Sequence, residues 1–292
     1  MGRAMCKIPS FCFSFLVLAL FISAWPAVAQ TAASLNAAVL PGSRATPVNT
    51  TITVFASIVN GGDTGATGCS VALSSNGNPS GISFSYRAFQ ADNATPAAPA
   101  NTPVDIAGHS AQAFVLSLIP STAFAGTDIN FDFSCSSGET APLIPGVNTL
   151  FMISTSGPTA DIITIAATPT HDGEVRIGSL GGAEVMTVAA INIGNGGAST
   201  PVIVVPDTGE YLLPLDIFVC ETDPQTSLCK APPALTVNTA VGSAPATFAV
   251  FANSTQGDGV PEFPDIARVH IRFYQGTGTA ADGPRKKANK SG

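Results

Sequence analysis

Two segments of this chain share one alternation of apolar and polar residues, and both end in the tripeptide Asn-Gly-Gly. They are residues 52–62 and residues 187–197. An alternation with a period of two residues indicates a β-strand that is buried on one face. Asn and Gly readily adopt the positive backbone angles that a tight turn requires. The repeat therefore predicts two copies of one β unit, with Asn60 aligned with Asn195.

Three further pairs of segments extend this repeat along the chain. Residues 82–88 match 213–219, residues 129–133 match 269–273, and residues 110–116 match 244–250 more loosely. The offset between matching segments drifts from about 131 to 140 residues, which indicates units that differ mainly in loop length. Helical periodicity is nearly absent, and 28 Gly and 23 Pro residues argue against long helices.

These patterns predict an all-β fold made of two tandem immunoglobulin-like β-sandwich domains. We expect the first domain at 32–154 and the second at 159–276, joined by a linker at 155–158. The predicted mature chain, residues 30–292, is long enough for two sandwiches of roughly 100 residues each. Residues 277–292 have little apolar content and are expected to form a disordered basic tail.

The first 29 residues have the character of a signal peptide. Arg3 and Lys7 precede an apolar run at 11–22, and Ala27 and Ala29 give the small-x-small pattern that signal peptidase recognises before Gln30. The run is shorter than the roughly 20 residues that a membrane-spanning helix needs. We therefore expect cleavage, with an uncleaved anchor as the alternative, and a secreted or periplasmic location in the bacterial cell envelope.

The predicted mature chain is acidic and sparsely charged. Without Arg3 and Lys7 it has 10 basic residues against 19 acidic ones, a formal net charge of −9. Such a surface repels a phosphate backbone, which argues against nucleic-acid binding. Four of the ten basic residues lie in the last eight positions, where they form a solvated tail or contact an anionic surface.

Four cysteines remain after cleavage, and an even number in an exported chain indicates disulfides. They are Cys69, Cys135, Cys220 and Cys229, which allow three pairings. We predict Cys69–Cys135 and Cys220–Cys229, because each bridge then stays within one domain. A zinc site is the alternative, but the spacings match no zinc pattern and no His lies beside any of the four.

The order of these motifs resembles a known family. A strand ending in Asn-Gly-Gly, a Phe-centred strand and a closing strand are similar to the bacterial cell-adhesion-related domain and its immunoglobulin-like relatives. The paired pattern over 48–274, with a Cys-x8-Cys hairpin in its second half, also resembles uncharacterised exported bacterial proteins. The resemblance implies a fold and a loose association with adhesion, and it supplies no site residues.

Candidate catalytic residues are few and separate. His109 and His171 lie in turn-like segments, and His270 lies on the polar face of a strand. None has the local spacing of a zinc enzyme, and the sequence has no Gly-x-Ser-x-Gly nucleophile motif. We therefore assign no catalytic residues.

Calcium and sugar sites receive equally little support. Residues 172–174 and 256–259 carry Asp-Gly pairs, but neither segment supplies the six to eight oxygens that calcium prefers. Trp25 leaves with the signal peptide, and Tyr211 is the ring that we expect to be exposed. We assign no metal and no cofactor.

The sequence therefore favours an exported, non-catalytic binding or surface-interaction module whose partner is a protein or a cell-surface component. Its exposed edge strands can accept a partner strand through backbone hydrogen bonds. The alternatives are a structural component of an envelope assembly and, with the least support, a secreted hydrolase with an unrecognised site.

Overall fold

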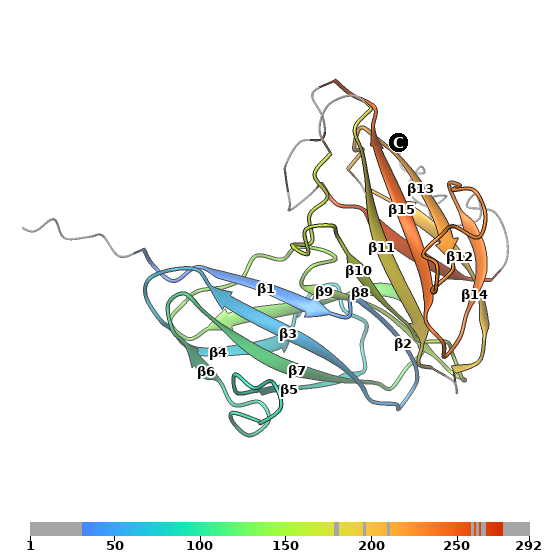
Figure 1. Ribbon diagram of the computed structural model, residues 1–292. Helices are drawn as coiled ribbons and strands as arrows, with labels where there is room; N and C mark the ends of the chain where they lie inside the picture. Colours follow the sequence, from blue (N-terminus) through green and yellow to red (C-terminus); the bar gives the residue numbers. More distant parts are fainter. Residues whose placement is uncertain are drawn as a thin grey trace, which may run out of the picture.

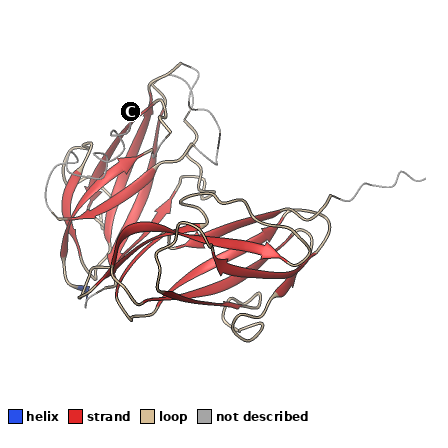
Figure 2. Cartoon of the chain, turned by 180° about the vertical axis from the view of Figure 1, so that it is seen from behind, coloured by secondary structure: helices blue, strands red, loops and turns tan. Residues whose placement is uncertain are grey.

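The computed structural model describes residues 31–177, 181–194, 197–208, 211–257, 260, 263 and 267–276. Within these residues it contains strands and loops but no α-helix, so the all-β fold class is confirmed (Figure 2). No described helix is long and apolar enough to cross a membrane. The predicted signal peptide and its cleavage site at Ala27, Ala29 and Gln30 lie outside the described residues, as does the predicted tail at 277–292.

In the N-terminal half, two sheets pack against each other (Figure 1). The first sheet has the order β1 (Leu35–Leu40), β3 (Ile52–Asn60), β7 (Ser110–Pro120) and β5 (Ile82–Ala88). The second has the order β2 (Ser43–Pro47), β9 (Thr149–Thr155), β8 (Phe124–Cys135), β4 (Ala66–Leu73) and β6 (Val104–Ile106). Neighbouring strands are antiparallel, except that β2 runs parallel to β9.

The C-terminal half also has two sheets. The first has the order β10 (Ile162–Ala167), β11 (Ala183–Asn192), β15 (Ala246–Ser254) and β13 (Leu215–Thr222). The second has the order β14 (Val237–Val241), β12 (Thr200–Asp207) and β16 (His270–Gln275). All of these pairs are antiparallel.

Alternate side chains of these strands fill two separate cores. The N-terminal core contains Phe114 and Phe133, and the rings of Phe84 and Phe131 meet between the two sheets with centroids 5.9 Å apart. The C-terminal core is built around Phe248, which is fully buried. Because side chains on a strand alternate between faces, the period-two pattern of the sequence places these apolar residues inside.

One part of the predicted repeat is wrong. The sequence pattern places Ile193 on the inner face of its strand, but Ile193 is 50% exposed, whereas Val188, Ala190 and Asn192 are buried. The alternation in β11 is therefore displaced by one residue. Asn192, rather than the predicted Asn195, is the structural counterpart of Asn60.

Asn60 and Asn192 hold the ends of their strands in the same way. The Oδ1 atom of Asn60 accepts a hydrogen bond from the backbone N–H of Gly62 at 3.1 Å, and that of Asn192 accepts one from Gly194 at 3.0 Å. Each Nδ2 group donates to a nearby backbone carbonyl. A buried amide that satisfies backbone groups removes a desolvation cost, which explains why both positions carry Asn.

A buried ion pair joins the two halves. The guanidinium of Arg44 on β2 contacts the carboxylate of Asp161, just before β10, with Nε–Oδ2 and Nη2–Oδ2 distances of 2.9 and 2.8 Å. The other oxygen, Oδ1, accepts a hydrogen bond from the backbone N–H of Ala45 at 2.9 Å. Asp161 is only 4% exposed, so this contact fixes the start of the C-terminal half against β2.

Candidate functional site

An exposed apolar row crosses the outer face of the β1-β3-β7-β5 sheet. Leu40, Phe55 and Val115 stand opposite one another on β1, β3 and β7. Leu40 is 68% exposed and Phe55 is 60% exposed. Apolar side chains gathered on an open sheet face lose unfavourable contact with water when a partner covers them. This row is therefore a candidate binding surface.

Small side chains form the neighbouring row and hollow out the surface. Ala38, Ser57 and Ala113 pair across the same three strands, two positions along from Leu40, Phe55 and Val115. A groove of about 740 Å³ lies over them, within the range of roughly 300–1,000 Å³ that is typical of ligand sites. The larger side chains of the first row form one wall of this groove.

The other wall comes from the segment that follows β5. Phe89 forms an isolated bridge with Pro96, and the backbone N–H of Gln90 donates to the carbonyl of Thr95 at 2.8 Å. Gln112 on β7 donates from Nε2 to the carbonyl oxygens of Phe89 and Ala113. These bonds hold the segment in place, so its wall of the groove is formed before any ligand arrives.

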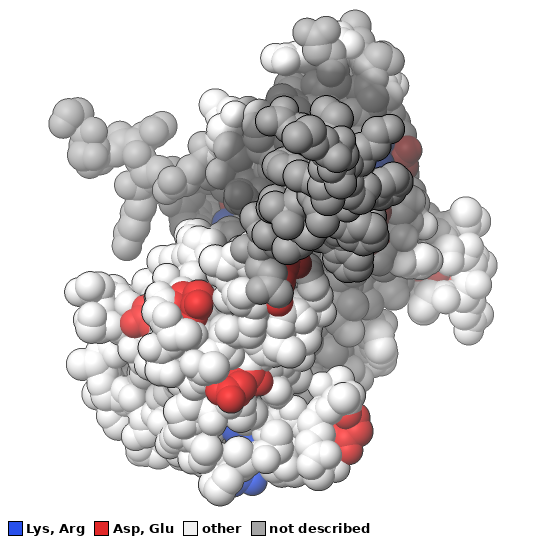
Figure 3. Space-filling view, turned by 90° about the vertical axis from the view of Figure 1, so that its left-hand side faces the viewer, with Lys and Arg blue, Asp and Glu red and all other residues white. Residues whose placement is uncertain are grey.

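The lining of the groove has no charged residue. Its apolar members are Leu40, Phe55, Phe89, Phe114, Val115 and six alanines, and its polar members are Ser57, Gln90, Asn93 and Gln112. Figure 3, which views one side of the molecule, shows acidic and basic side chains scattered among uncharged ones on that side. An uncharged lining favours a ligand whose buried part is also uncharged, because burial of an unpaired charge is costly.

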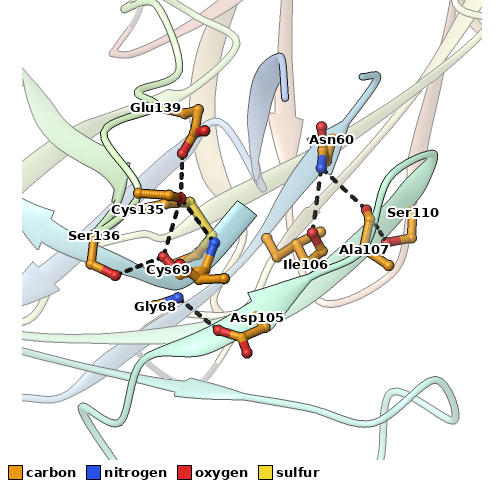
Figure 4. Close-up of a disulfide and its surroundings, with 12 residues drawn as sticks. Asn60, Gly68, Cys69, Asp105, Ile106, Ala107, Ser110, Cys135, Ser136 and Glu139 are labelled. Atoms are coloured by element: carbon orange, nitrogen blue, oxygen red, sulfur yellow. Dashed lines mark hydrogen bonds between the residues drawn. A yellow bond between two sulfur atoms is a disulfide. The ribbon is translucent and has the colours of Figure 1, made fainter. Parts of the chain in front are cut away.

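Both predicted disulfides are present. Cys69 on β4 is bonded to Cys135 on β8, directly opposite it in the sheet (Figure 4). Cys220 on β13 is bonded to Cys229 and closes the hairpin that covers the edge of that strand. Two disulfides indicate an oxidising, extracytoplasmic environment.

His109 lies beside a carboxylate, but the pair lacks the arrangement of a nucleophilic site. Its Nε2 atom is 2.8 Å from Oδ1 of Asp63, and the hydroxyl of Thr31 donates to Oδ2 of the same carboxylate at 2.8 Å. The backbone N–H of Thr31, with His109 and the Thr31 hydroxyl, lowers the pKa of Asp63 to about 2. Among the described residues, the hydroxyl bonds to the carboxylate and not to the imidazole, so the three groups do not have the hydroxyl–imidazole–carboxylate order of a nucleophilic triad.

The other two histidines lie in different elements with different neighbours. His171 is in a turn with φ of 58°, and its backbone N–H donates to the carbonyl of Thr168. His270 is on β16, where burial and the nearby Arg272 lower the pKa of its imidazole. The described residues thus do not gather the three histidines into one site.

The two segments weighed as calcium sites in the sequence bring no cluster of metal-binding side chains together in the described part of the chain. No group of three or more His, Cys, Asp or Glu residues is placed there to hold an ion. In the 172–174 segment, Asp172 accepts from Thr170 and from the N–H of Glu174, and it pairs with Arg176. These contacts lower the pKa of Asp172. The second candidate, 256–259, lies partly outside the described residues.

A second, smaller hollow lies beside the Cys220–Cys229 hairpin. It has a volume of about 400 Å³ and contains Glu221 and Lys230, whose charged groups are paired with each other. The other carboxylate oxygen of Glu221 accepts from the hydroxyl of Thr239 at 2.6 Å. Because its charges are already satisfied internally, this hollow offers an incoming ligand less than the apolar groove does. Tyr211 is 43% exposed and lines neither hollow.

Sequence reasoning did not find the groove, although a signal for it was present. The inner positions of β1, β3 and β7 carry the strong apolar alternation that predicts strands. The groove is formed by the outer positions, where small residues such as Ala38 and Ala113 stand beside Leu40 and Phe55. A large apolar residue at an outward position was the available signal.

The comparisons with known proteins name no family. No family model and no curated protein matches this chain. Among solved structures, it is similar to the secreted serine protease VesC from Vibrio cholerae, at 10% identity and a TM-score of 0.26, over 80% of this chain and 49% of that one. It is also similar to a protein of unknown function from Porphyromonas gingivalis W83, at 13% identity and a TM-score of 0.24, over 75% and 83%. The chain spans about half the length of VesC, and at these TM-scores neither likeness bears on function.

Proposed function

We propose that this chain is an exported, non-catalytic binding module of two tandem immunoglobulin-like domains, and that its groove holds an uncharged, partly apolar segment of a partner protein. The observation that carries the proposal is the groove itself. It places an exposed Phe55 and Leu40 beside a hollow floor of small residues, which is the combination of anchor and pocket that concentrates binding energy.

A protein segment suits this groove better than a sugar or a charged ligand. The floor is made of methyl groups and one hydroxyl, so it offers few partners for the many hydroxyls of a sugar. The amides of Gln90 and Asn93 on one wall can bond to a peptide backbone, while Phe55 and Leu40 on the other wall can cover apolar side chains. The resemblance to the cell-adhesion-related domain points in the same direction.

The proposed location follows from the cysteines and the first residues. Two disulfides favour a compartment where thiols are oxidised. The apolar run and the Ala-Val-Ala pattern at the start of the sequence indicate a signal peptide. A module exported to the periplasm or the medium meets partners in the cell envelope or on other cells.

The test is a comparison of partner capture by matched variants. Phe55→Ser removes the largest exposed apolar side chain of the groove. Leu143→Ser removes a 52% exposed side chain that does not line it. Mature protein and both variants are immobilised and incubated with envelope extract, and recovered proteins are quantified by mass spectrometry.

We expect a protein that is recovered by the wild type and by Leu143→Ser but is reduced about tenfold or more by Phe55→Ser, because burial of a Phe side chain contributes on the order of 2 kcal/mol. A set of recovered proteins that is the same for all three samples would refute the proposal.

A further inference from the structure

Asn-Gly dipeptides occur at three places in this chain, at 60–61, 76–77 and 195–196. The structure describes the first two, and the third lies outside the described residues. In such a dipeptide the backbone nitrogen of Gly can attack the neighbouring side-chain amide, because Gly has no side chain to shield that nitrogen. The two described dipeptides therefore carry the same reactive groups in different surroundings.

The groups of the first dipeptide are held in place. Asn60 is fully buried, and its Oδ1 atom accepts from the N–H of Ser34 at 3.1 Å. Its Nδ2 group donates to the carbonyl oxygens of Ile106 and Ala107 at 3.3 and 3.2 Å (Figure 4). The attacking nitrogen is engaged as well, since the N–H of Gly61 donates to the carbonyl of Ser34 at 2.8 Å. These hydrogen bonds must break before the two groups can react, so the reaction is suppressed here.

The second dipeptide faces solvent. Asn76 and Gly77 lie in the connection 74–81 between β4 and β5, and both residues are exposed. Within the described part of the chain, no hydrogen bond holds the side-chain amide of Asn76 or the N–H of Gly77. Both reacting groups can therefore approach each other while the protein stays folded.

The hydrogen bonds of this connection lie at its two ends. The N–H of Ser74 donates to the carbonyl of Asn130 at 3.0 Å, and the N–H of Asn130 donates to Oδ1 of Asn78 at 2.7 Å. At the other end, the N–H of Ser121 donates to the carbonyl of Gly81 at 2.7 Å. The tip between these anchors can therefore change conformation without moving the adjoining strands.

From these observations, we propose that Asn76 is a site of spontaneous modification in the folded protein, where the side-chain amide is converted to a carboxylate. The backbone nitrogen of Gly77 gives up its proton to a base in solution and bonds to Cγ of Asn76, and Nδ2 takes up a proton and leaves as ammonia. The product is a cyclic succinimide. Water then opens this ring at either carbonyl, which gives aspartate or, when the main chain runs through Cβ, isoaspartate. In total, one water is consumed and one ammonia is released.

The modification changes the charge of the connection. Residues 74–81 contain no charged side chain, so the new carboxylate introduces the first charge into this segment. Isoaspartate also lengthens the main chain by one carbon atom, which the tip can accommodate because the anchoring hydrogen bonds lie outside it. We therefore expect the modified protein to keep its fold and its stability.

Peptide mapping of the full mature protein tests this inference. The protein is incubated at physiological temperature in mildly alkaline buffer, with and without urea, and is digested at mildly acidic pH, where the reaction is slow. Mass spectrometry then measures the fractions of aspartate and isoaspartate at positions 60 and 76 over time. Without urea, we expect conversion at position 60 to be at least about tenfold slower than at position 76, because the hydrogen bonds of Asn60 add to the barrier. In urea, we expect the two positions to convert at similar rates, since both have the same dipeptide.

Two variants serve as controls. Asn76→Gln has a longer side chain that must close a larger ring, and we expect the products at position 76 to disappear while those at position 60 are unchanged. Phe55→Ser alters the groove and should convert at the wild-type rate, so this site is tested independently of the proposed function. The converted wild type and Asn76→Gln are expected to unfold at the same urea concentration.

Two rate results would overturn the inference: conversion at position 76 that occurs only in urea, or equal rates at positions 60 and 76 without urea. A lower denaturation midpoint for the converted protein would also overturn it, since the modification would then be incompatible with the native fold.

Discussion

Replacement of Asn192 by Ala tests the corrected register of the repeat. The Oδ1 atom of Asn192 accepts hydrogen bonds from the N–H groups of Asp161 and Gly194, both at 3.0 Å. Its Nδ2 group donates to the carbonyl of Ala198 at 2.8 Å and to the hydroxyl of Thr200 at 3.3 Å. The residue is only 2% exposed, so water reaches these groups poorly once the amide is removed.

The expected loss of stability can be worked from these bonds. A buried donor left without a partner costs about 1–3 kcal/mol, and Asn192→Ala removes the partner of two donors. Allowing for partial relaxation, we expect the free energy of unfolding to fall by about 2–4 kcal/mol. That is a large part of the roughly 5–15 kcal/mol that stabilises a typical domain.

Urea denaturation of the mature protein, followed by fluorescence and circular dichroism, measures this change. Asn36→Ala is a suitable control, because Asn36 is an exposed residue on β1, and its replacement is expected to change stability by less than about 0.5 kcal/mol. The sequence pattern aligned Asn60 with Asn195. If Asn195→Ala proves costly and Asn192→Ala does not, the corrected register is refuted.

Three further perturbations follow from the structure. Asp161→Ala leaves Arg44 buried without its partner and should cost about 3–5 kcal/mol in urea denaturation, while replacing both residues with apolar ones should recover most of it. The pKa of Asp63 is lowered to about 2, so the ionised form favours the folded state. Its stabilising contribution is complete above about pH 4 and is lost as the pH falls towards 2. Asp63→Asn should remove this pH dependence, which is measured by hydrogen exchange of the backbone amides in the first described residues. Replacement of Cys69 and Cys135 by Ser should cost roughly 4 kcal/mol, since the bridge closes a loop of 66 residues; an unchanged denaturation midpoint would contradict that expectation.

The period-two pattern predicted the strands well where burial alone determines which positions are apolar. Ile129, Phe131 and Phe133 are inward-facing and fully or nearly fully buried, as their alternation indicates. The all-β class follows directly from such segments. The pairing of the four cysteines could also be predicted, because a bridge within one repeat is the simplest arrangement.

The same pattern failed where a polar residue is buried. In β11 the inner positions include Asn192, and the exposed Ile193 continues the opposite alternation. Apolar residues stand on both faces of this strand, so hydrophobicity alone does not distinguish them. Asn192 is needed inside because its side chain accepts from the N–H of Asp161 and donates to the carbonyl of Ala198. Only the folded chain brings these two groups together.

Contacts between the halves, and the groove, depend on tertiary structure in the same way. Arg44 and Asp161 are 117 residues apart, and nothing in their local sequence indicates that they pair. The groove requires β1, β3 and β7 to be neighbours in a particular register. A sequence pattern specifies which face of each strand is apolar, but it does not specify which outer residues meet.

Site-specific photo-crosslinking from the groove floor tests the central claim most directly. A photoreactive amino acid at Ser57, between Ala38 and Ala113, is compared in the native host with the same group at Leu143, outside the groove. The account predicts an adduct with one partner protein from position 57 alone, which maps to an uncharged, partly apolar segment and is lost with Phe55→Ser. Adducts that are the same from both positions, or that persist with Phe55→Ser, would contradict it.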